Sequence, residues 1–234
     1  MLILAFESSA KAASVALLQD GHLLGEYFQN SGQTHSRTLT KMAQDLLANC
    51  DLTPKDVTAV AVAKGPGSFT GVRIGVAAAK GFCWGLEIPC VGVSTLEAMA
   101  TTCFAPGRVL CPVMDARRSE VYNALFSVEG TALQRLTPDR PISLEALCTE
   151  LKKIKKEKIL VGDGAQLCYN ALREEIPDLL LLPEHLRYQR AAGVALAAQP
   201  LLERGETESA AALQPNYLRL SQAERERLAR MGRN

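Results

Sequence analysis

The residues whose types and spacing could do chemistry begin with a glycine-rich stretch, KGPGSFTGVRIG, at positions 64–75. Gly65 and Gly67 flank a proline, and glycine adopts positive φ angles that other residues avoid. Ser68 or Thr70 could cap the helix that follows, and the N–H groups of its first turn would then face an anion. The spacing matches neither a Walker loop nor a dinucleotide fingerprint. We expect either a phosphate-binding loop or, as the favoured alternative, a turn where two backbones pack closely.

Carboxylates follow apolar runs at two comparable positions. Glu7 ends the run LILAF and precedes Ser8 and Ser9, where it could hold a metal-bound water. The favoured alternative is a turn in which this acid accepts hydrogen bonds from local backbone N–H groups. Asp115 ends the run VLCPVM and precedes two arginines, whose forked guanidinium groups match phosphate oxygens. An internal Asp–Arg pair or a plain surface loop is the slightly favoured alternative there.

The sequence contains no recognisable metal site or catalytic triad. Its three histidines are His22, His35 and His185, and the fourth residue after His35 is Leu39, so no histidine pair has helical spacing. His35 is expected to cap a helix or to lie at the surface. No Ser-His-Asp or Cys-His set has an interpretable spacing. We expect neither a bound metal nor hydrolase activity.

The composition excludes several classes of protein. The 234 residues include 26 basic and 25 acidic side chains, so no bulk charge draws the chain onto nucleic acid or a membrane. The basic run KKIKKEK at 152–158 could contact an RNA backbone, but a solvated helix face is favoured. Seven scattered cysteines without a CxxC pair indicate buried, reduced thiols. Without a signal-peptide pattern or an apolar run of roughly 18 residues, we expect a cytoplasmic protein.

Alternating strands and helices must position these residues. An Asp20-Gly21 pair between apolar runs predicts a hairpin. Apolar residues at three- and four-residue spacing predict a helix with Ser36 as its N-cap. In order, we expect strands at 2–7, 12–19 and 22–29, this helix, a buried strand, a helix at 71–85, a short strand and a helix at 94–103.

The second half repeats this order of elements. It reads as a strand, an acidic turn, a strand, a Glu129-Gly130 turn, a strand, a helix and a buried strand. We therefore expect an α/β fold with two related halves, 1–105 and 106–220, in which a last helix near 190–204 could cross back to the first half. A polar tail at 221–234 follows.

The helix after the glycine stretch carries small residues on one face. Gly71, Gly75 and Ala79 are four apart, so they share a face of the helix. Such a bare stripe lets another helix approach closely. That helix could belong to the same chain, or to a partner that also contacts the apolar stripe at 39–47. Spacing alone leaves both alternatives open.

Five segments together resemble one known family. They are FESS at 6–9, THS at 34–36, GPGSFTGVRIG at 65–75, GVSTLEAMA at 92–100 and MDARRSEVY at 114–122. In this combination the chain is similar to the bacterial TsaB (YeaZ) family over nearly its whole length, most strongly over 1–125. The resemblance implies a fold of the actin-like ATPase (ASKHA) superfamily, with two ribonuclease-H-like halves that arose by duplication.

The resemblance also implies a function. It is that of a non-catalytic dimerisation or scaffold subunit of the complex that transfers a threonylcarbamoyl group to adenosine 37 of tRNAs reading ANN codons. Such a subunit pairs with the catalytic paralogue TsaD, works with the ATPase TsaE, forms a homodimer when alone and meets tRNA only through the complex. It requires no cofactor, and ATP or ADP with Mg²⁺ would bind at the complex interface. The alternative is a stand-alone nucleotide-binding kinase or ATPase of the same fold.

Site residues follow from the same resemblance. The interface would lie on the helices at 36–49 and 71–85, with contacts from His35, Leu39, Met42, Ala43, Leu46, Gly71, Val72, Arg73, Gly75, Val76 and Ala79. An inherited nucleotide or phosphate site would use Glu7, Ser8, Ser9, Gly65, Gly67, Ser68, Thr70 and Asp115. The family's first strand more often ends in Asp, so Glu7 departs from the inherited metal geometry. The resemblance implies a metal-binding HxxxH pair in the catalytic paralogue, and its absence from this sequence fits a non-catalytic subunit.

Overall fold

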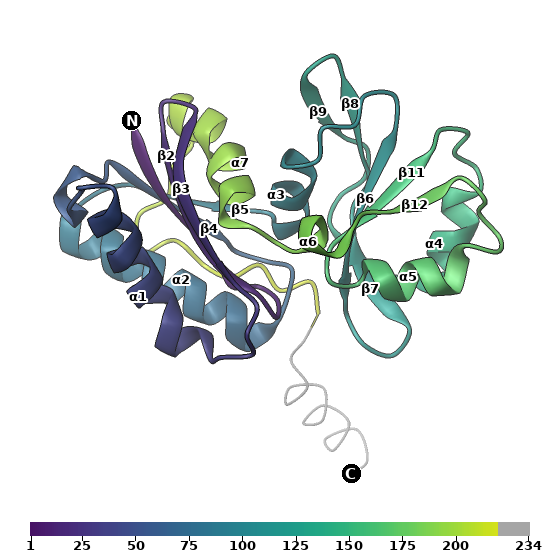
Figure 1. Cartoon of the computed structure of the whole chain (residues 1–234), viewed down its shortest axis with the longest axis horizontal. Coiled ribbons are helices and arrows are strands. Elements are labelled where there is room, and N and C mark those ends of the chain that lie inside the picture. Colours follow the sequence, from purple (N-terminus) through teal and green to yellow (C-terminus); the bar gives the residue numbers. More distant parts are fainter. Residues whose placement is uncertain (220–234) are drawn as a thin grey trace, which may run out of the picture.

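The computed structural model describes residues 1–219, which form two β-sheets side by side with helices between them and on their outer sides (Figure 1). The expected polar tail at 221–234 lies outside the described residues.

The first sheet has five strands in the order β3-β2-β1-β4-β5. β1, β2 and β3 are antiparallel neighbours, while β4 and β5 run parallel to β1. Asp20 and Gly21 join β2 to β3 with φ angles of 47° and 84°, as a type I′ hairpin turn requires. The elements are β1 (Leu2–Glu7), β2 (Ala13–Gln19), β3 (His22–Gln29), α1 (His35–Asn49), a 3₁₀ turn (Pro54–Asp56), β4 (Ala59–Ala63), α2 (Phe69–Leu86), β5 (Cys90–Val93) and α3 (Thr95–Thr101).

The second sheet repeats this arrangement along the path β10-β7-β6-β11-β12. β6 takes the place of β1, with antiparallel β7 on one side and parallel β11 on the other. The elements are β6 (Val109–Asp115), β7 (Glu120–Asn123), β8 (Phe126–Glu129), β9 (Ala132–Arg135), β10 (Arg140–Ser143), α4 (Leu144–Leu151), β11 (Lys158–Val161), α5 (Ala165–Leu172), β12 (Leu179–Leu181), α6 (Glu184–Arg187) and α7 (Ala191–Glu203).

The third strand of this repeat is not the one that the sequence predicts. The Glu129-Gly130 turn joins β8 to β9, which form a hairpin off the main path of the sheet. β10 instead occupies the position equivalent to β3, because it pairs with β7. The hairpin is an insertion in the repeat, and a turn signal alone could not distinguish it from the main meander.

Successive side chains of β1 point to opposite faces of the first sheet, and each face has its own core. Leu4 and Phe6 pack on the outer side beneath α1 and α2, whereas Ile3 and Ala5 pack on the inner side against α7. Successive side chains of a strand point to opposite faces, so a strand that is apolar throughout must be covered on both. All six residues of β1 are buried.

The two halves exchange their last helices. α7 follows the second sheet in the chain but packs on the first, where Val194 and Ala195 contact the inner face. α3 follows the first sheet but packs on the second, where Leu96 and Met99 join a core with Phe126. The two helices lie side by side between the sheets (Figure 1). α3 thus contributes to both halves, since Leu96 and Met99 lie in the second core and Ala98 packs with α7 in the first.

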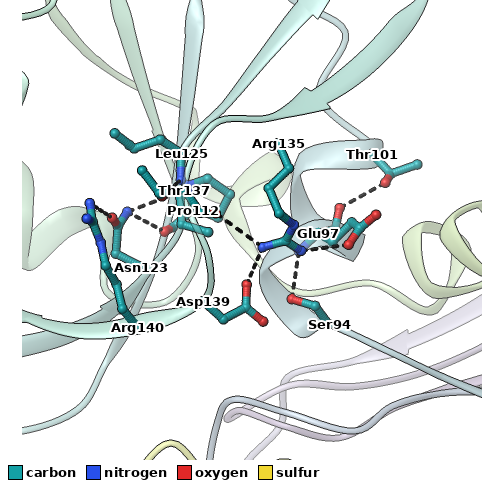
Figure 2. Close-up of polar contacts among 11 residues, drawn as sticks. Ser94, Glu97, Thr101, Pro112, Asn123, Leu125, Arg135, Thr137, Asp139 and Arg140 are labelled. Atoms are coloured by element: carbon teal, nitrogen blue, oxygen red, sulfur yellow. Dashed lines mark hydrogen bonds and ion pairs between the residues drawn. The ribbon is translucent and has the colours of Figure 1, made fainter.

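Polar contacts reinforce this exchange where α3 meets the β8–β9 hairpin (Figure 2). Arg135 pairs with Glu97 of α3 at 2.6 Å and with Asp139 at 2.6 Å. Its guanidinium also lies 4.6 Å from the centre of the Phe126 ring. Partial burial lowers the pKa of Arg135, but its two carboxylate partners outweigh this effect and the pKa rises. Arg135 therefore stays charged where the halves meet.

Three expected helix boundaries differ from the observed ones. α1 begins at His35 with Thr34 rather than Ser36 at the N-cap position, and Thr34 makes no side-chain cap bond. α2 begins at Phe69, two residues earlier than predicted. α4 ends at Leu151, so most of the basic run at 152–158 is a connection and not a helix face.

The basic run is also less available than the sequence suggests. Lys158 is buried in β11 and pairs with Asp178 at 2.7 Å, while Lys152 pairs with Glu175 at 2.5 Å. Lys155 and Lys156 remain exposed.

All seven cysteines are free thiols, and five of them are buried. Within residues 1–219, no helix is long and apolar enough to cross a membrane.

Candidate functional site

The glycine stretch is a turn in which the start of α2 lies directly on the end of β1. The backbone N–H of Ser68 donates to the Ser9 carbonyl at 2.6 Å. A Cβ atom at Gly67 would overlap the Ser9 carbonyl, and one at Gly71 would overlap the Ser8 carbonyl. Only residues without a side chain allow this approach of two backbones.

The other side of the stretch is covered by residues 206–219, an irregular segment that we call the strap. The N–H of Asn216 donates to the Lys64 carbonyl at 2.6 Å. A Cβ atom at Gly65, where φ is 116°, would lie 2.5 Å from the Asn216 carbonyl oxygen. The stretch is thus held between β1 and the strap.

Close packing explains the glycines of this stretch without a bound phosphate. The space that the missing side chains leave at Gly65, Gly67 and Gly71 is filled by the chain's own backbone. The Ser68 side chain caps α2 by accepting a hydrogen bond from the Gly71 N–H at 3.3 Å. Thr70 lies inside the first turn with its side chain exposed, so it is not the cap. The favoured alternative, a close-packed turn, accounts for the glycines.

Glu7 lies at the end of β1 and its side chain is completely buried. Its Oε1 accepts a hydrogen bond from the Ser9 N–H at 2.6 Å, while Oε2 has no partner among the described residues. Burial raises the pKa of Glu7 to about 7, against the lowering effect of the bonds from Ser9; the charge of Asp163 raises it further. The neighbouring Ser8 hydroxyl donates to the Gly71 carbonyl at 2.9 Å. Neither serine side chain is open to a ligand.

Asp163 is an acidic residue of this region that the sequence analysis did not single out. It follows β11, and its Oδ1 accepts a hydrogen bond from the buried Gln189 amide at 2.8 Å. Burial raises the pKa of Asp163, and the charge of Asp115 adds to the rise. The sequence could have indicated Asp163 by its position between Gly162 and Gly164, directly after a buried strand.

Asp115 organises its own turn. Its Oδ1 accepts a hydrogen bond from the Arg117 backbone N–H at 2.7 Å, as the surface-loop alternative expects. Within residues 1–219, no group of three or more His, Cys, Asp or Glu side chains is arranged to hold a metal ion. Of the eight predicted nucleotide residues, the structure brings seven together where the start of α2 meets the end of β1, while Asp115 lies at the end of β6.

The predicted interface stripe on α2 faces the chain's own interior. A Cβ atom at Gly75 would lie 2.5 Å from the Ser8 hydroxyl oxygen, and Ala79 is fully buried. The small-residue stripe of α2 is thus packed against the end of β1. The structure therefore places Gly71, Gly75 and Ala79 inside the chain.

The other apolar residues of the predicted interface are also internal. They form the core between α1, α2 and the first sheet; the set is Leu39, Met42, Ala43, Leu46, Val72 and Val76. An amphipathic helix turns its apolar face to its own sheet, so these residues are unavailable to another chain. His35 is half-buried, and its Nε2 lies 2.7 Å from the Ala10 carbonyl oxygen as a hydrogen-bond partner. Of the whole predicted set, Arg73 alone is exposed.

A second small-residue stripe on α2 faces outward. Ala77, Gly81 and Gly85 are four apart and exposed. A Cβ atom at Gly81 or Gly85 would meet no atom within 4 Å. The same side of the helix carries Trp84, whose side chain is 74% exposed. No contact within residues 1–219 explains two glycines at these helical positions.

Comparison with known proteins identifies the family. The family model for TsaD, tRNA N6-adenosine threonylcarbamoyltransferase, matches residues 25–227. The chain is 33% identical to the tRNA threonylcarbamoyladenosine biosynthesis protein TsaB of Bacillus subtilis, with 96% of each chain covered. The chain belongs to the TsaB (YeaZ) family. The Escherichia coli TsaB is 31% identical, with 94% of this chain and 95% of that one covered.

The fold is that of the TsaB family as well. YeaZ from Pseudomonas aeruginosa superimposes with a TM-score of 0.76 at 25% identity, covering 93% of this chain and 99% of that one. The two equivalent sheets have the duplicated architecture expected of two related halves. Because the TsaD model also matches most of the chain, TsaB and the transferase family share this scaffold.

Proposed function

We propose that this chain is a cytoplasmic, non-catalytic dimerisation subunit in the synthesis of threonylcarbamoyladenosine in tRNA. It pairs with a TsaD-family catalytic subunit, works with a TsaE-type ATPase and pairs with itself when that partner is absent. Its relatives are named for this pathway, and the matching family model is that of the transferase. In this proposal the chain needs no cofactor of its own.

The observation that carries the proposal is the outward stripe of α2. Glycine inside a helix destabilises it by roughly 0.5–1 kcal/mol relative to alanine, so two exposed glycines need a reason. Ala77, Gly81 and Gly85 leave the backbone bare along one side, as close approach of a second helix requires. The neighbouring Trp84 offers a large apolar contact of the kind that concentrates binding energy in interfaces. The interface thus uses the predicted helix but its opposite face.

The test is gel filtration of the purified chain mixed with the TsaD-family protein of the same organism. The wild type is expected to co-elute with that protein, and Gly81→Leu is expected to elute separately. A leucine there enters open space in the free chain, so the variant should keep its fold by circular dichroism. Ala171→Leu, on the exposed side of α5, is the matched control and should co-elute. Unchanged co-elution of Gly81→Leu would remove the proposed interface.

Calorimetry with ATP and Mg²⁺ tests the non-catalytic assignment separately. The isolated chain should give no binding heat, because its glycine stretch packs against the end of β1 and the strap. Micromolar binding by the chain alone would instead support the kinase or ATPase alternative. In the proposed complex, any nucleotide binds at the surface shared with the partner.

A further inference from the structure

Three segments that are far apart in the sequence bring four arginines onto one surface. The first turns of α2 supply Arg73, the turn between β6 and β7 supplies Arg117 and Arg118, and the end of the strap supplies Arg219. We call these four residues the arginine rim. The strap, yellow in Figure 1, leaves the first sheet and runs towards the second half, so it joins the other two segments.

Specific contacts hold the three segments together. Arg73 Nε donates to the Tyr217 hydroxyl at 2.7 Å. Two residues later, Arg219 donates to the Ala116 carbonyl at 3.0 Å and pairs with Glu120 at 2.7 Å. Two residues of extended chain span at most about 7 Å, so the start of α2 and the turn at 116–119 belong to one continuous surface.

The turn that presents Arg117 and Arg118 is strained. Arg117, Arg118 and Ser119 have φ angles of 63°, 58° and 58°, a left-handed conformation that non-glycine residues rarely adopt in succession. All three are exposed, and within residues 1–219 neither arginine side chain forms a hydrogen bond or an ion pair. Strain of this kind gathers at ligand clamps and switch regions. No contact within residues 1–219 therefore explains why two arginines stand in this turn.

An aromatic stack lies beside Arg73 of the rim. The rings of Phe69 and Tyr217 lie 4.1 Å apart and 7° from parallel. The Arg73 guanidinium is 5.4 Å from the first ring centre and 5.5 Å from the second. Tyr217 remains 38% exposed. Exposed aromatic rings beside arginines are the surfaces on which unpaired nucleobases stack.

The charge of the surface favours a polyanion. Among the described residues, two carboxylates are engaged with the rim: Glu120 pairs with Arg219, and Asp115 accepts a hydrogen bond from the Arg117 backbone N–H. Positive charge therefore remains in excess at Arg73, Arg117 and Arg118. Guanidinium forks match phosphate oxygens in two-point hydrogen bonds.

We propose that the arginine rim binds the phosphate backbone of RNA, with Tyr217 available to stack an unpaired base. The proposal rests on the proposed function, since a tRNA-modifying complex brings an RNA to this subunit. It replaces the expectation that tRNA is met only through other subunits. The basic run at 152–158 is not the RNA contact, because two of its lysines are already paired within the chain.

The test measures RNA binding by the complex of the full chain with its TsaD-family partner. The probe is a fluorescently labelled, unmodified tRNA transcript that reads a codon starting with A, followed by anisotropy at several salt concentrations. The variant is Arg117→Asn with Arg118→Asn, because asparagine tolerates the left-handed conformation and should preserve the turn. Its affinity should fall about tenfold at physiological salt, and the slope of log K against log salt should flatten by roughly 1.4–1.8.

The matched control is Lys155→Asn with Lys156→Asn, which removes the same charge from exposed positions outside the rim. Its affinity should change by less than about twofold. Equal weakening by the two double variants, no weakening by the arginine variant, or no RNA binding by the wild-type complex would each overturn the proposal. Co-elution with the partner is scored in parallel. If wild-type pairing itself fails, the proposed function falls, and anisotropy on the chain alone still tests the rim.

Discussion

Glu7 shows how a single residue can be identified from sequence while its environment is not. A carboxylate after an apolar strand and before two serines indicates a turn, and the bond from the Ser9 N–H is of this local kind. Glu7 is completely buried, and the charge of Asp163, which lies far away in the chain, raises its pKa further. Because burial results from long-range packing, the raised pKa of Glu7 could not be predicted from the neighbouring residues in the sequence.

The raised pKa predicts how Glu7 affects stability. A carboxyl group with a pKa near 4.5 in the unfolded chain and about 7 in the folded protein binds more protons in the folded state between these values. Its contribution is therefore complete below pH 4.5 and is lost as the pH rises to 7. Glu7→Gln keeps the carbonyl acceptor and removes the titration. Relative to wild type, its free energy of unfolding should rise by about 3 kcal/mol from pH 4.5 to 8, as measured by urea denaturation.

A carboxylate with the opposite shift provides the control. Asp56 accepts hydrogen bonds at 2.7 Å from both the N–H and the hydroxyl of Thr53, and these bonds lower its pKa. Asp56→Asn should therefore lose stability relative to wild type at neutral pH and not in acid. If Glu7→Gln also loses stability as the pH rises, the burial argument for Glu7 is wrong.

At the scale of elements, helical spacing predicted α2 but not its orientation. The sequence places Gly71, Gly75 and Ala79 on one face, and Ala77, Gly81 and Gly85 lie on another by the same rule. Periodicity shows which residues share a face, but not which face meets the sheet. The first stripe lies against the carbonyl end of β1, where only small residues fit, and this leaves the second stripe outside.

This orientation predicts opposite effects for two alanine substitutions in one helix. Gly75→Ala places a Cβ atom 2.5 Å from the buried Ser8 hydroxyl oxygen, and overpacking of this kind typically destabilises by about 1–3 kcal/mol. Gly81→Ala meets no atom within 4 Å and should stabilise by roughly 0.5–1 kcal/mol through helix propensity. Thermal unfolding of the two variants measures both effects. Stabilisation by both, or by neither, would contradict the assigned orientation of α2.

At the scale of the whole molecule, the sequence predicted the duplication and missed its consequences. Five matched elements were enough to infer two related halves, because each element carries its own local pattern. The passage of α3 onto the second sheet has no local signal, since its apolar face would suit either core. Leu213 within the strap is fully buried in the first core, far along the chain from the sheet that it covers.

Because the halves exchange α3 and α7, we predict that they unfold as one cooperative unit. Leu147 lies in the outer core of the second half, and its truncation should destabilise that core by about 2–5 kcal/mol. If the unit is cooperative, Leu147→Ala also speeds native-state hydrogen exchange of the amides of β4 (Ala59–Ala63) in the first sheet by the same free energy. Leu167→Ala, at a position of α5 whose side chain is 42% exposed, should leave those amides unchanged. Unaltered exchange in β4 with faster exchange in β11 would mean that the halves open independently. The exchanged helices would then be contacts between two folding units, and the core that α3 shares with Phe126 would not couple them.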